Sequence, residues 1–142
     1  MADMPNMKVQ PYLFFDGRCE EALEFYKKAI GAEVTFMMRV DESPDKGGAH
    51  ASGDKIMHAA FMVGNTLIMA SDGFAKGNPK FEGFSLSITA KDEAESKKLF
   101  GALCEGGEVT QAIIKTFFSP AFGMVKDKFG MHWMVIVPQE MA

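Results

Sequence analysis

Gly31-Ala32-Glu33-Val34-Thr35 returns 75 residues later as Gly106-Gly107-Glu108-Val109-Thr110. In both places a helix-like stretch precedes the glycine and a strand-like stretch follows it. Glycine at this point is typical of a helix end, because it accepts the left-handed backbone conformation that closes many helices. The repeat therefore indicates that the 142-residue chain contains two copies of one structural unit.

The first copy reads as a strand, a helix and three further strands. Its expected elements are a strand at 10–15, a helix at 19–30, and strands at 34–40, 56–63 and 66–70. Asp16-Gly17 stops the first strand, and Gly64-Asn65 between the last two strands is typical of a tight hairpin turn. A polar loop at 41–55 contains Gly and Pro, and its His50 is expected to face solvent, although such a loop could also fold over a cleft.

The second copy repeats this order after a linker at about 76–82. Its expected elements are a strand at 84–89, a helix that runs through Leu103, and strands at 109–115, 121–125 and 131–137. Asp92-Glu93-Ala94-Glu95 fits a capping box at the helix start. We expect a single α+β domain over residues 1–142, with modules at about 8–75 and 83–138. Because each βαβββ module leaves one sheet face open, two modules can form a curved mixed sheet around a cleft.

Composition places the chain among globular proteins with one substantial core, since 47% of its residues are hydrophobic and 24% are charged. A net charge of -4 without a basic stripe argues against a nucleic-acid partner. Because no stretch approaches the roughly 20 apolar residues of a membrane span and the start is unlike a signal peptide, we expect a cytoplasmic protein without a membrane partner. Cys19 and Cys104 lack a CxxC spacing and are expected to be reduced and structural.

Four stretches resemble the PhnB-like branch of the vicinal oxygen chelate superfamily, the group of glyoxalases, extradiol dioxygenases and bleomycin resistance proteins. They are Pro11 to Tyr26, Met57-His58-Ala59, Leu67 to Asp72, and Phe122 to Met134. The resemblance implies the glyoxalase fold, a small-molecule ligand and a homodimer.

This branch often carries the label 3-demethylubiquinone-9 3-methyltransferase. A methyltransferase is not expected, because no glycine cluster lies at a strand-to-helix turn of a parallel sheet.

The resemblance also locates the superfamily's metal site, which takes His, Gln or Glu from the first strand and Glu from the last strand of each unit. Those places correspond to Pro11, Met69, Gly83 and Met134. None of these residues offers the imidazole nitrogen or carboxylate oxygen that such metals prefer. We therefore predict no metal at the usual site and no cofactor.

Strand alternation gives the expected lining of the cleft. If Gly64-Asn65 is a two-residue turn, the face that holds Met69 also holds Met62 and His58. The residues predicted to contact the ligand are Leu13, Phe15, His58, Met62, Met69, Ser85, Ser87, His132 and Met134. Such a lining favours a largely apolar molecule held by a few directed hydrogen bonds.

His58 is the predicted catalytic residue. Imidazole titrates near neutral pH, so on an open strand face it can act as a general base, a hydrogen-bond donor or a lone metal ligand. The alternative is structural, with His58 bridging neighbouring strands.

Three functions remain open from the sequence. The first is a metal-independent small-molecule-binding protein or enzyme. The second is a metal-dependent glyoxalase- or dioxygenase-type enzyme with a site displaced to His58 and His132. The third is a drug-sequestering resistance protein, for which the predicted lining lacks an inward carboxylate. The cleft forms either within one chain or across a dimer, in which the modules can be exchanged.

Overall fold

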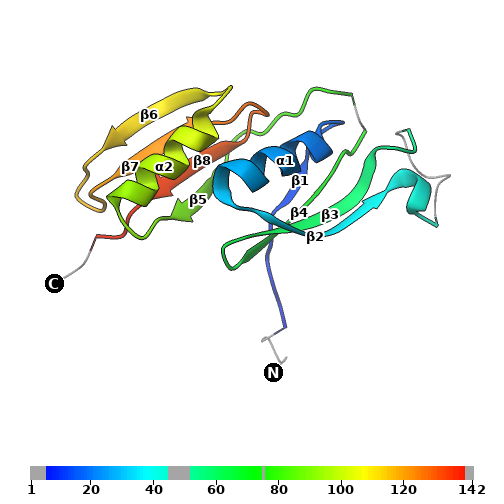
Figure 1. Cartoon of the computed structure of the whole chain (residues 1–142), viewed down its shortest axis with the longest axis horizontal. Helices are drawn as coiled ribbons and strands as arrows, with labels where there is room; N and C mark the ends of the chain where they lie inside the picture. Colours follow the sequence, from blue (N-terminus) through cyan, green and yellow to red (C-terminus); the bar gives the residue numbers. More distant parts are fainter. Residues whose placement is uncertain (1–5, 45–51, 75, 140–142) are drawn as a thin grey trace.

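Two four-stranded sheets, each crossed by one helix, make up the computed structural model of the protein (Figure 1). It describes residues 6–44, 52–74 and 76–139. The first unit comprises β1 (Tyr12–Phe14), α1 (Cys19–Ile30), β2 (Glu33–Arg39), the short 3-10 helix η1 (Val40–Glu42), β3 (Ile56–Val63) and β4 (Thr66–Ser71). The second comprises β5 (Leu86–Thr89), α2 (Glu93–Cys104), β6 (Glu108–Ile114), β7 (Phe122–Lys126) and β8 (His132–Ile136). The predicted pair of βαβββ units and the α+β class are confirmed.

The two sheets have the same strand order, β1-β4-β3-β2 and β5-β8-β7-β6. The first strand of each unit pairs in parallel with the last, and the other pairs are antiparallel. The predicted hairpin register is confirmed, with Met62 opposite Leu67 and Ala60 opposite Met69. A two-residue turn fixes that register, because the two residues that flank the turn must then pair with each other.

The repeated glycine acts differently at the ends of the two helices. Gly31 is the C-cap of α1 in the left-handed conformation, with φ of 69°, and its N–H donates to the carbonyl of Tyr26. Helix α2 ends one residue earlier than the repeat predicts, with Glu105 as its C-cap, and the left-handed residue Gly106 follows it. The predicted capping box of α2 is present in part, since the Asp92 side chain accepts a 2.8 Å hydrogen bond from the Glu95 N–H. The Glu95 carboxylate in turn accepts from the Lys91 N–H at 3.0 Å.

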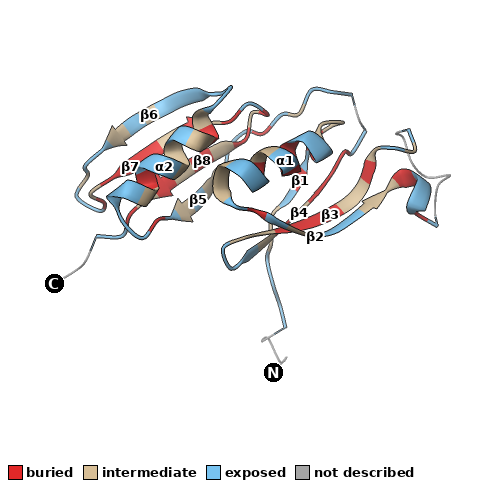
Figure 2. Cartoon of the chain, in the orientation of Figure 1, coloured by how far each residue is buried: buried red, intermediate tan, exposed pale blue. Residues whose placement is uncertain are grey.

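The core lies between the helices and one face of each sheet, where the buried strand residues are concentrated (Figure 2). Phe61 and Ile68 bury this face of the first sheet, and Trp133 and Val135 that of the second. The two helices also contact each other, so the core is continuous from one unit to the next. In the described part of the chain, no helix lies over the opposite face of either sheet (Figure 1).

A buried carboxylate, Asp127, joins the two units. Its Oδ2 accepts hydrogen bonds from the Tyr26 hydroxyl at 2.5 Å and from the Trp133 indole N–H at 2.9 Å, and its Oδ1 accepts from the backbone N–H groups of Phe129 and Met131. Burial raises the pKa of Tyr26 well above its ordinary value, and the charge of Asp127 raises it further. Four donors thus compensate for burying the carboxylate.

The prediction that Leu13 and Phe15 line the open face is wrong. Their side chains are 1% and 0% exposed, and the Phe15 ring packs against Tyr26 in the core. The β1–β4 register aligns Tyr12 with Met69, so Tyr12 and Phe14 occupy the open face instead. A one-residue shift in register moves every side chain of a strand to the other face, and no hairpin turn fixes the register of this parallel pair.

No helix in the described part of the chain has the length and hydrophobicity needed to cross a bilayer.

Candidate functional site

Four rings gather on the open face of the first sheet, and we call this group the aromatic face: Tyr12, Phe14, Phe36 and His58. The ring of Tyr12 lies 5.0 Å from that of Phe14 and 5.5 Å from that of His58, measured between centroids. Phe36 lies 5.8 Å from His58 on the other side. Phe14 is 58% exposed and Phe36 45% exposed, so these rings present apolar surface that the described part of the chain leaves uncovered.

Strand pairing explains why these rings meet although the chain separates them. β1 supplies Tyr12 and Phe14, β2 supplies Phe36, and β3 supplies His58. The β2–β3 register aligns Phe36 with Ala60, which belongs to the open side of β3. β4 lies between β1 and β3, so Tyr12 reaches His58 across that strand, whereas Phe36 contacts His58 from the adjacent strand β2. Together with the Tyr12–Phe14 contact, these contacts make the four rings one continuous surface.

Tyr12 and His58 are joined by a hydrogen bond of 3.0 Å between the phenol oxygen and imidazole Nδ1. When the phenol donates, the proton of the neutral imidazole lies on Nε2. The bond therefore fixes the orientation of the imidazole ring and leaves its Nε2 free to form a hydrogen bond with a ligand. His58 thus has the strand-bridging contact of the structural alternative and also an oriented nitrogen on an exposed face. Tyr12 was not predicted as a site residue, because strand alternation had placed it on the core side of β1.

The second sheet has an equivalent open face with a different set of rings, since Phe122 of β7 lies there and packs against Phe118. The β5–β8 register aligns Ser87 with Met134, just as the β1–β4 register aligns Tyr12 with Met69. Ser87 is exposed, whereas Met134 and His132 are half-buried. Met69 and Met134 therefore occupy matching places in the two units. Met62 of β3 shares the open face of the first sheet, and Ser85, half-buried, precedes β5.

The donor chemistry at the superfamily's metal positions does not fit a hard metal ion. Pro11 offers no side-chain donor, Gly83 has no side chain, and Met69 and Met134 offer only thioethers. Within residues 6–44, 52–74 and 76–139, no group of three or more His, Cys, Asp or Glu side chains could hold a metal ion. His50 lies outside the described residues.

Cys19 lies at the start of α1 but is buried beside a second buried carboxylate, Asp72. The Asp72 side chain accepts hydrogen bonds from the backbone N–H groups of Cys19 at 2.8 Å and Ile56 at 2.6 Å. Burial raises the pKa of the Cys19 thiol far above its ordinary value, and the negative charge of Asp72 adds to the effect. Since the thiolate is the reactive form, Cys19 is a structural residue, as predicted.

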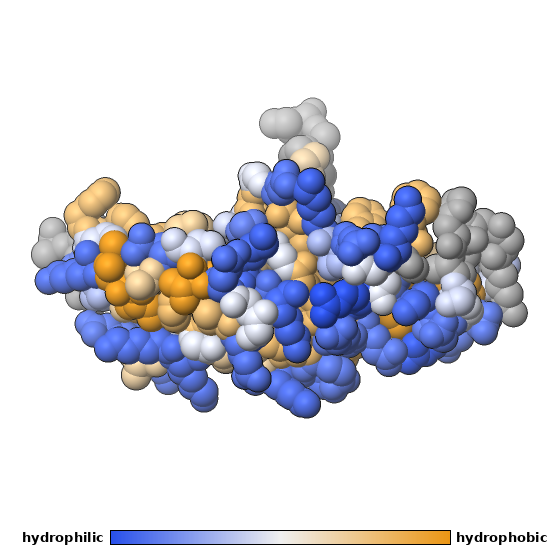
Figure 3. All heavy atoms as spheres, turned by 90° about the horizontal axis from the view of Figure 1, so that it is seen from above, coloured by the Kyte–Doolittle hydropathy of each residue, from blue (hydrophilic) through white to orange (hydrophobic). Residues whose placement is uncertain are grey.

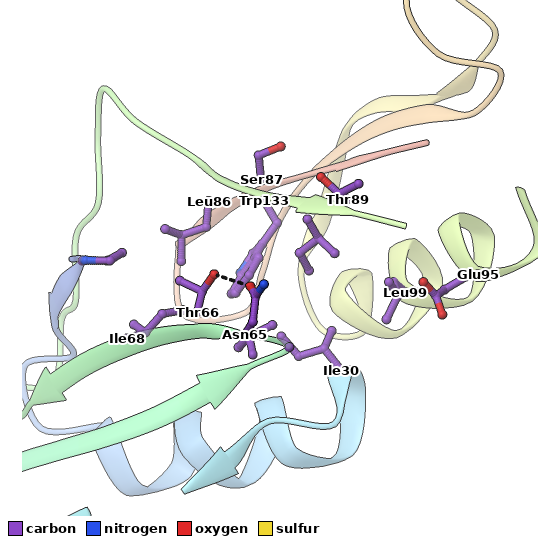
Figure 4. A pocket seen from close by; sticks show the side chains of 14 residues that line it. Ile30, Asn65, Thr66, Ile68, Leu86, Ser87, Thr89, Glu95, Leu99 and Trp133 are labelled. Carbon is purple, nitrogen blue, oxygen red and sulfur yellow. Dashed lines mark hydrogen bonds between the residues drawn. The ribbon is translucent and has the colours of Figure 1, made fainter. Parts of the chain in front are cut away.

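A pocket lies between the two units, and we call it the inter-module pocket (Figure 4). Its volume is about 450 Å³, within the range of small-molecule sites. Both units line it, with the residues Pro11, Ile30, Val63, Gly64, Asn65, Thr66, Ile68, Leu86, Ser87, Ile88, Thr89, Glu95, Leu99 and Trp133. Of the predicted ligand contacts, only Ser87 belongs to this pocket. Sequence reasoning missed it because its shape depends on how the two units pack together.

The comparisons with known proteins place this chain among relatives of the same length. The sequence profile of a family described as 3-demethylubiquinone-9 3-methyltransferase matches residues 7–136. Protein YjdN of Escherichia coli (strain K12) is 31% identical over 143 residues, which cover 94% of this chain and 97% of that protein.

Solved structures agree with this placement. The crystal structure of protein PA1353 from Pseudomonas aeruginosa superposes with a TM-score of 0.82 at 37% identity, covering 95% of this chain and 100% of that one. The PhnB protein from Bacillus cereus gives a TM-score of 0.77 at 26% identity, covering 92% and 99%. A glyoxalase-related enzyme from Fulvimarina pelagi, 13% identical with a TM-score of 0.61 and coverage of 93% and 88%, shares the fold.

Proposed function

The chain belongs to the family described as 3-demethylubiquinone-9 3-methyltransferase, the PhnB-like branch of the glyoxalase fold, and we propose that it binds a small molecule on the open faces of its sheets. The observation that carries the proposal is the Tyr12–His58 hydrogen bond within the exposed aromatic face. A directed polar pair surrounded by uncovered rings is what a mainly apolar ligand with one or two polar groups requires.

The phenylalanine rings and the hydrogen-bonded Tyr12–His58 pair have different roles in this proposal. Phe14 and Phe36 offer flat apolar area, and covering it stabilises a complex by about 25 cal/mol per Å². Stacked or edge-on contact between rings adds about 0.5–1.5 kcal/mol for each aromatic pair. Nε2 of His58 then selects the ligand's orientation, because a hydrogen bond in a partly covered site requires a correctly placed partner. The ligand class is therefore a planar, largely apolar molecule with a group that can hydrogen-bond to imidazole.

The topology supports binding rather than methyl transfer. Each sheet has one parallel pair at its edge, β1–β4 or β5–β8, and its other pairs are antiparallel. A donor site of the usual methyltransferase kind needs a glycine-rich turn between a strand and a helix of a parallel sheet. We therefore propose that the family's label does not describe the chemistry of this chain, and that the site works without a resident metal.

We also propose that the protein is a homodimer in which a second copy helps to cover the open faces. Phe14 and Phe36 leave apolar area uncovered on the first sheet. Apolar side chains also reach the surface over the second unit, at the left of Figure 3. In β6 of that unit, Val109 is 47% exposed and Ile114 is 45% exposed. Surfaces of this kind support self-association.

Cys19 and Cys104 are both free thiols, which supports a cytoplasmic location.

The test of the binding site is a fragment screen by NMR with 13C-methyl methionine labelling. Met62 and Met69 report on the first open face, and Met134 reports on the second. Planar heteroaromatic fragments are expected to shift the Met69 methyl resonance in the wild type and to bind at least tenfold more weakly to His58→Ala and Tyr12→Phe.

The matched control is His132→Ala, which removes a half-buried histidine from the second sheet and leaves the aromatic face intact. It is expected to retain fragment binding at Met69. Fragments that bind equally well to wild type, His58→Ala and Tyr12→Phe would refute the assignment of the aromatic face.

A further inference from the structure

The inter-module pocket differs in location and chemistry from the aromatic face. None of Tyr12, Phe14, Phe36 and His58 lines it. We propose that this pocket is a separate binding site for a compact apolar molecule that carries one ammonium group. The proposal does not depend on the function assigned to the open faces.

Apolar side chains from both units form much of the floor and walls of the pocket. In Figure 4, Ile30 and Ile68 approach from the first unit, while Leu86 and Trp133 approach from the second. Leu99 of α2 adds a further wall. An apolar ligand in this position contacts side chains of both units at once, so its binding free energy also holds the units together.

The edge of β5 gives the pocket a row of backbone polar groups. β5 is the outermost strand of its sheet, so one of its edges has no ladder partner among the described strands. The N–H of Ala90 donates to the carbonyl of Ile136 at 2.8 Å, which points that amide toward β8. Because successive amides of a strand alternate in direction, those of Ser87 and Thr89 point toward the free edge. Both residues line the pocket.

Glu95 supplies the charge that selects an ammonium group. Among the described residues it is the only charged one in the pocket lining, and its side chain is half-buried. The capping hydrogen bond from Lys91 N–H engages Oε1, which leaves the second carboxylate oxygen for a ligand. No ion pair of Glu95 occurs in the part of the chain that the structure describes. A carboxylate beside an apolar cavity favours a monocation over a neutral or anionic analogue.

Trp133 makes the pocket directly observable, because it is the only tryptophan in the chain and forms part of the floor. The experiment titrates the full-length protein with benzylamine, benzyl alcohol and benzoate, which share one ring and differ in charge. Benzylamine is expected to change the Trp133 emission saturably, with an affinity about fivefold higher than that of benzyl alcohol. Benzoate is expected to bind least.

Glu95→Gln is the decisive variant, because its amide oxygen can still accept the hydrogen bond from Lys91. It is expected to bind benzylamine and benzyl alcohol with equal affinity. Glu93→Gln is the matched control, since it removes one charge from the same helix turn at an exposed position outside the pocket. It is expected to keep the wild-type preference.

Val63→Phe supplies a second readout, because the larger side chain fills the space between the units. It is expected to reduce the affinity for both benzylamine and benzyl alcohol, with folding checked by thermal unfolding. The proposal is overturned if no probe gives a saturable change, or if Glu95→Gln keeps the preference for the amine. It is also overturned if His58→Ala or Tyr12→Phe abolishes the Trp133 response, because the probe would then occupy the aromatic face.

Discussion

The hydroxyl of Tyr26 donates a hydrogen bond of 2.5 Å to Oδ2 of Asp127, and this buried contact joins residues 101 positions apart in the sequence. Tyr26 belongs to the helix of the first unit, and Asp127 follows the strand β7 of the second. The bond therefore contributes to holding the duplicated units in one arrangement, on which the inter-module pocket depends.

Tyr26→Phe is expected to lower the free energy of unfolding by about 1–3 kcal/mol, because it removes one donor from a buried carboxylate and leaves the ring packing unchanged. Chemical denaturation measures the change. Tyr12→Phe, which removes an exposed hydroxyl, is expected to cost less than about 1 kcal/mol by the same measurement. Equal losses in the two variants would contradict the role assigned to the Tyr26–Asp127 bond.

Stability is also expected to fall in alkaline solution. The folded protein holds the Tyr26 proton more tightly than the unfolded chain, since the pKa of Tyr26 is raised by burial and by Asp127. The contribution of the protonated Tyr26 to the free energy of unfolding is therefore complete below the pKa of about 10 that tyrosine has in the unfolded chain. This contribution is lost as the pH rises through the pKa of Tyr26 in the folded protein. Urea unfolding across this range is expected to show a negative slope that is smaller in Tyr26→Phe. An identical slope in the variant would show that another group is responsible.

Two glycines with equally open surroundings are expected to respond oppositely to alanine. A Cβ built at Gly31 or at Gly101 meets no atom of the described residues within 4 Å, but only Gly31 of the two has a positive φ, at +69°. Gly31→Ala is expected to destabilise the protein by about 1–2 kcal/mol. Gly101→Ala, inside α2, is expected to stabilise it by about 0.5–1 kcal/mol. Thermal unfolding of the two variants measures these changes. A shift of Tm in the same direction in both variants would refute this explanation.

The two cysteines are expected to differ in reactivity. Cys19 is buried and its thiol pKa is raised, whereas Cys104 is partly exposed. Under native conditions a thiol-alkylating reagent is therefore expected to modify Cys104 first, as located by peptide mass spectrometry. In urea both thiols are expected to react at similar rates. Faster native labelling of Cys19 would show that it is more accessible than the structure indicates.

The parts of the fold that could be predicted from the sequence are those controlled by local chemistry. The 19–30 helix was predicted with its observed bounds, because Gly31 provides a local stop signal. The β3–β4 register followed from the two-residue turn Gly64-Asn65. Alternation along β8 also accounts for Trp133, which is buried on the core side between the half-buried His132 and Met134.

The errors and omissions arose where distant segments meet. The faces of β1 were assigned the wrong way round, so Leu13 and Phe15 replaced Tyr12 and Phe14 in the predicted site. The parallel β1–β4 register depends on a long connection rather than on a turn. The inter-module pocket was missed for a related reason, since its lining residues come from both units and meet only when the units pack together. The ligand roles of His58, Met62, Met69, Ser85, Ser87, His132 and Met134 stay predictions.

The most direct test of binding on the aromatic face is to measure intermolecular nuclear Overhauser effects between a bound planar fragment and the protein. We expect contacts from the fragment's ring protons to Phe14, Phe36 and the Met69 methyl group, all lost in His58→Ala. Contacts confined to the helix side of the sheets, such as Leu99, with binding unchanged in His58→Ala, would show that the ligand does not bind on the aromatic face.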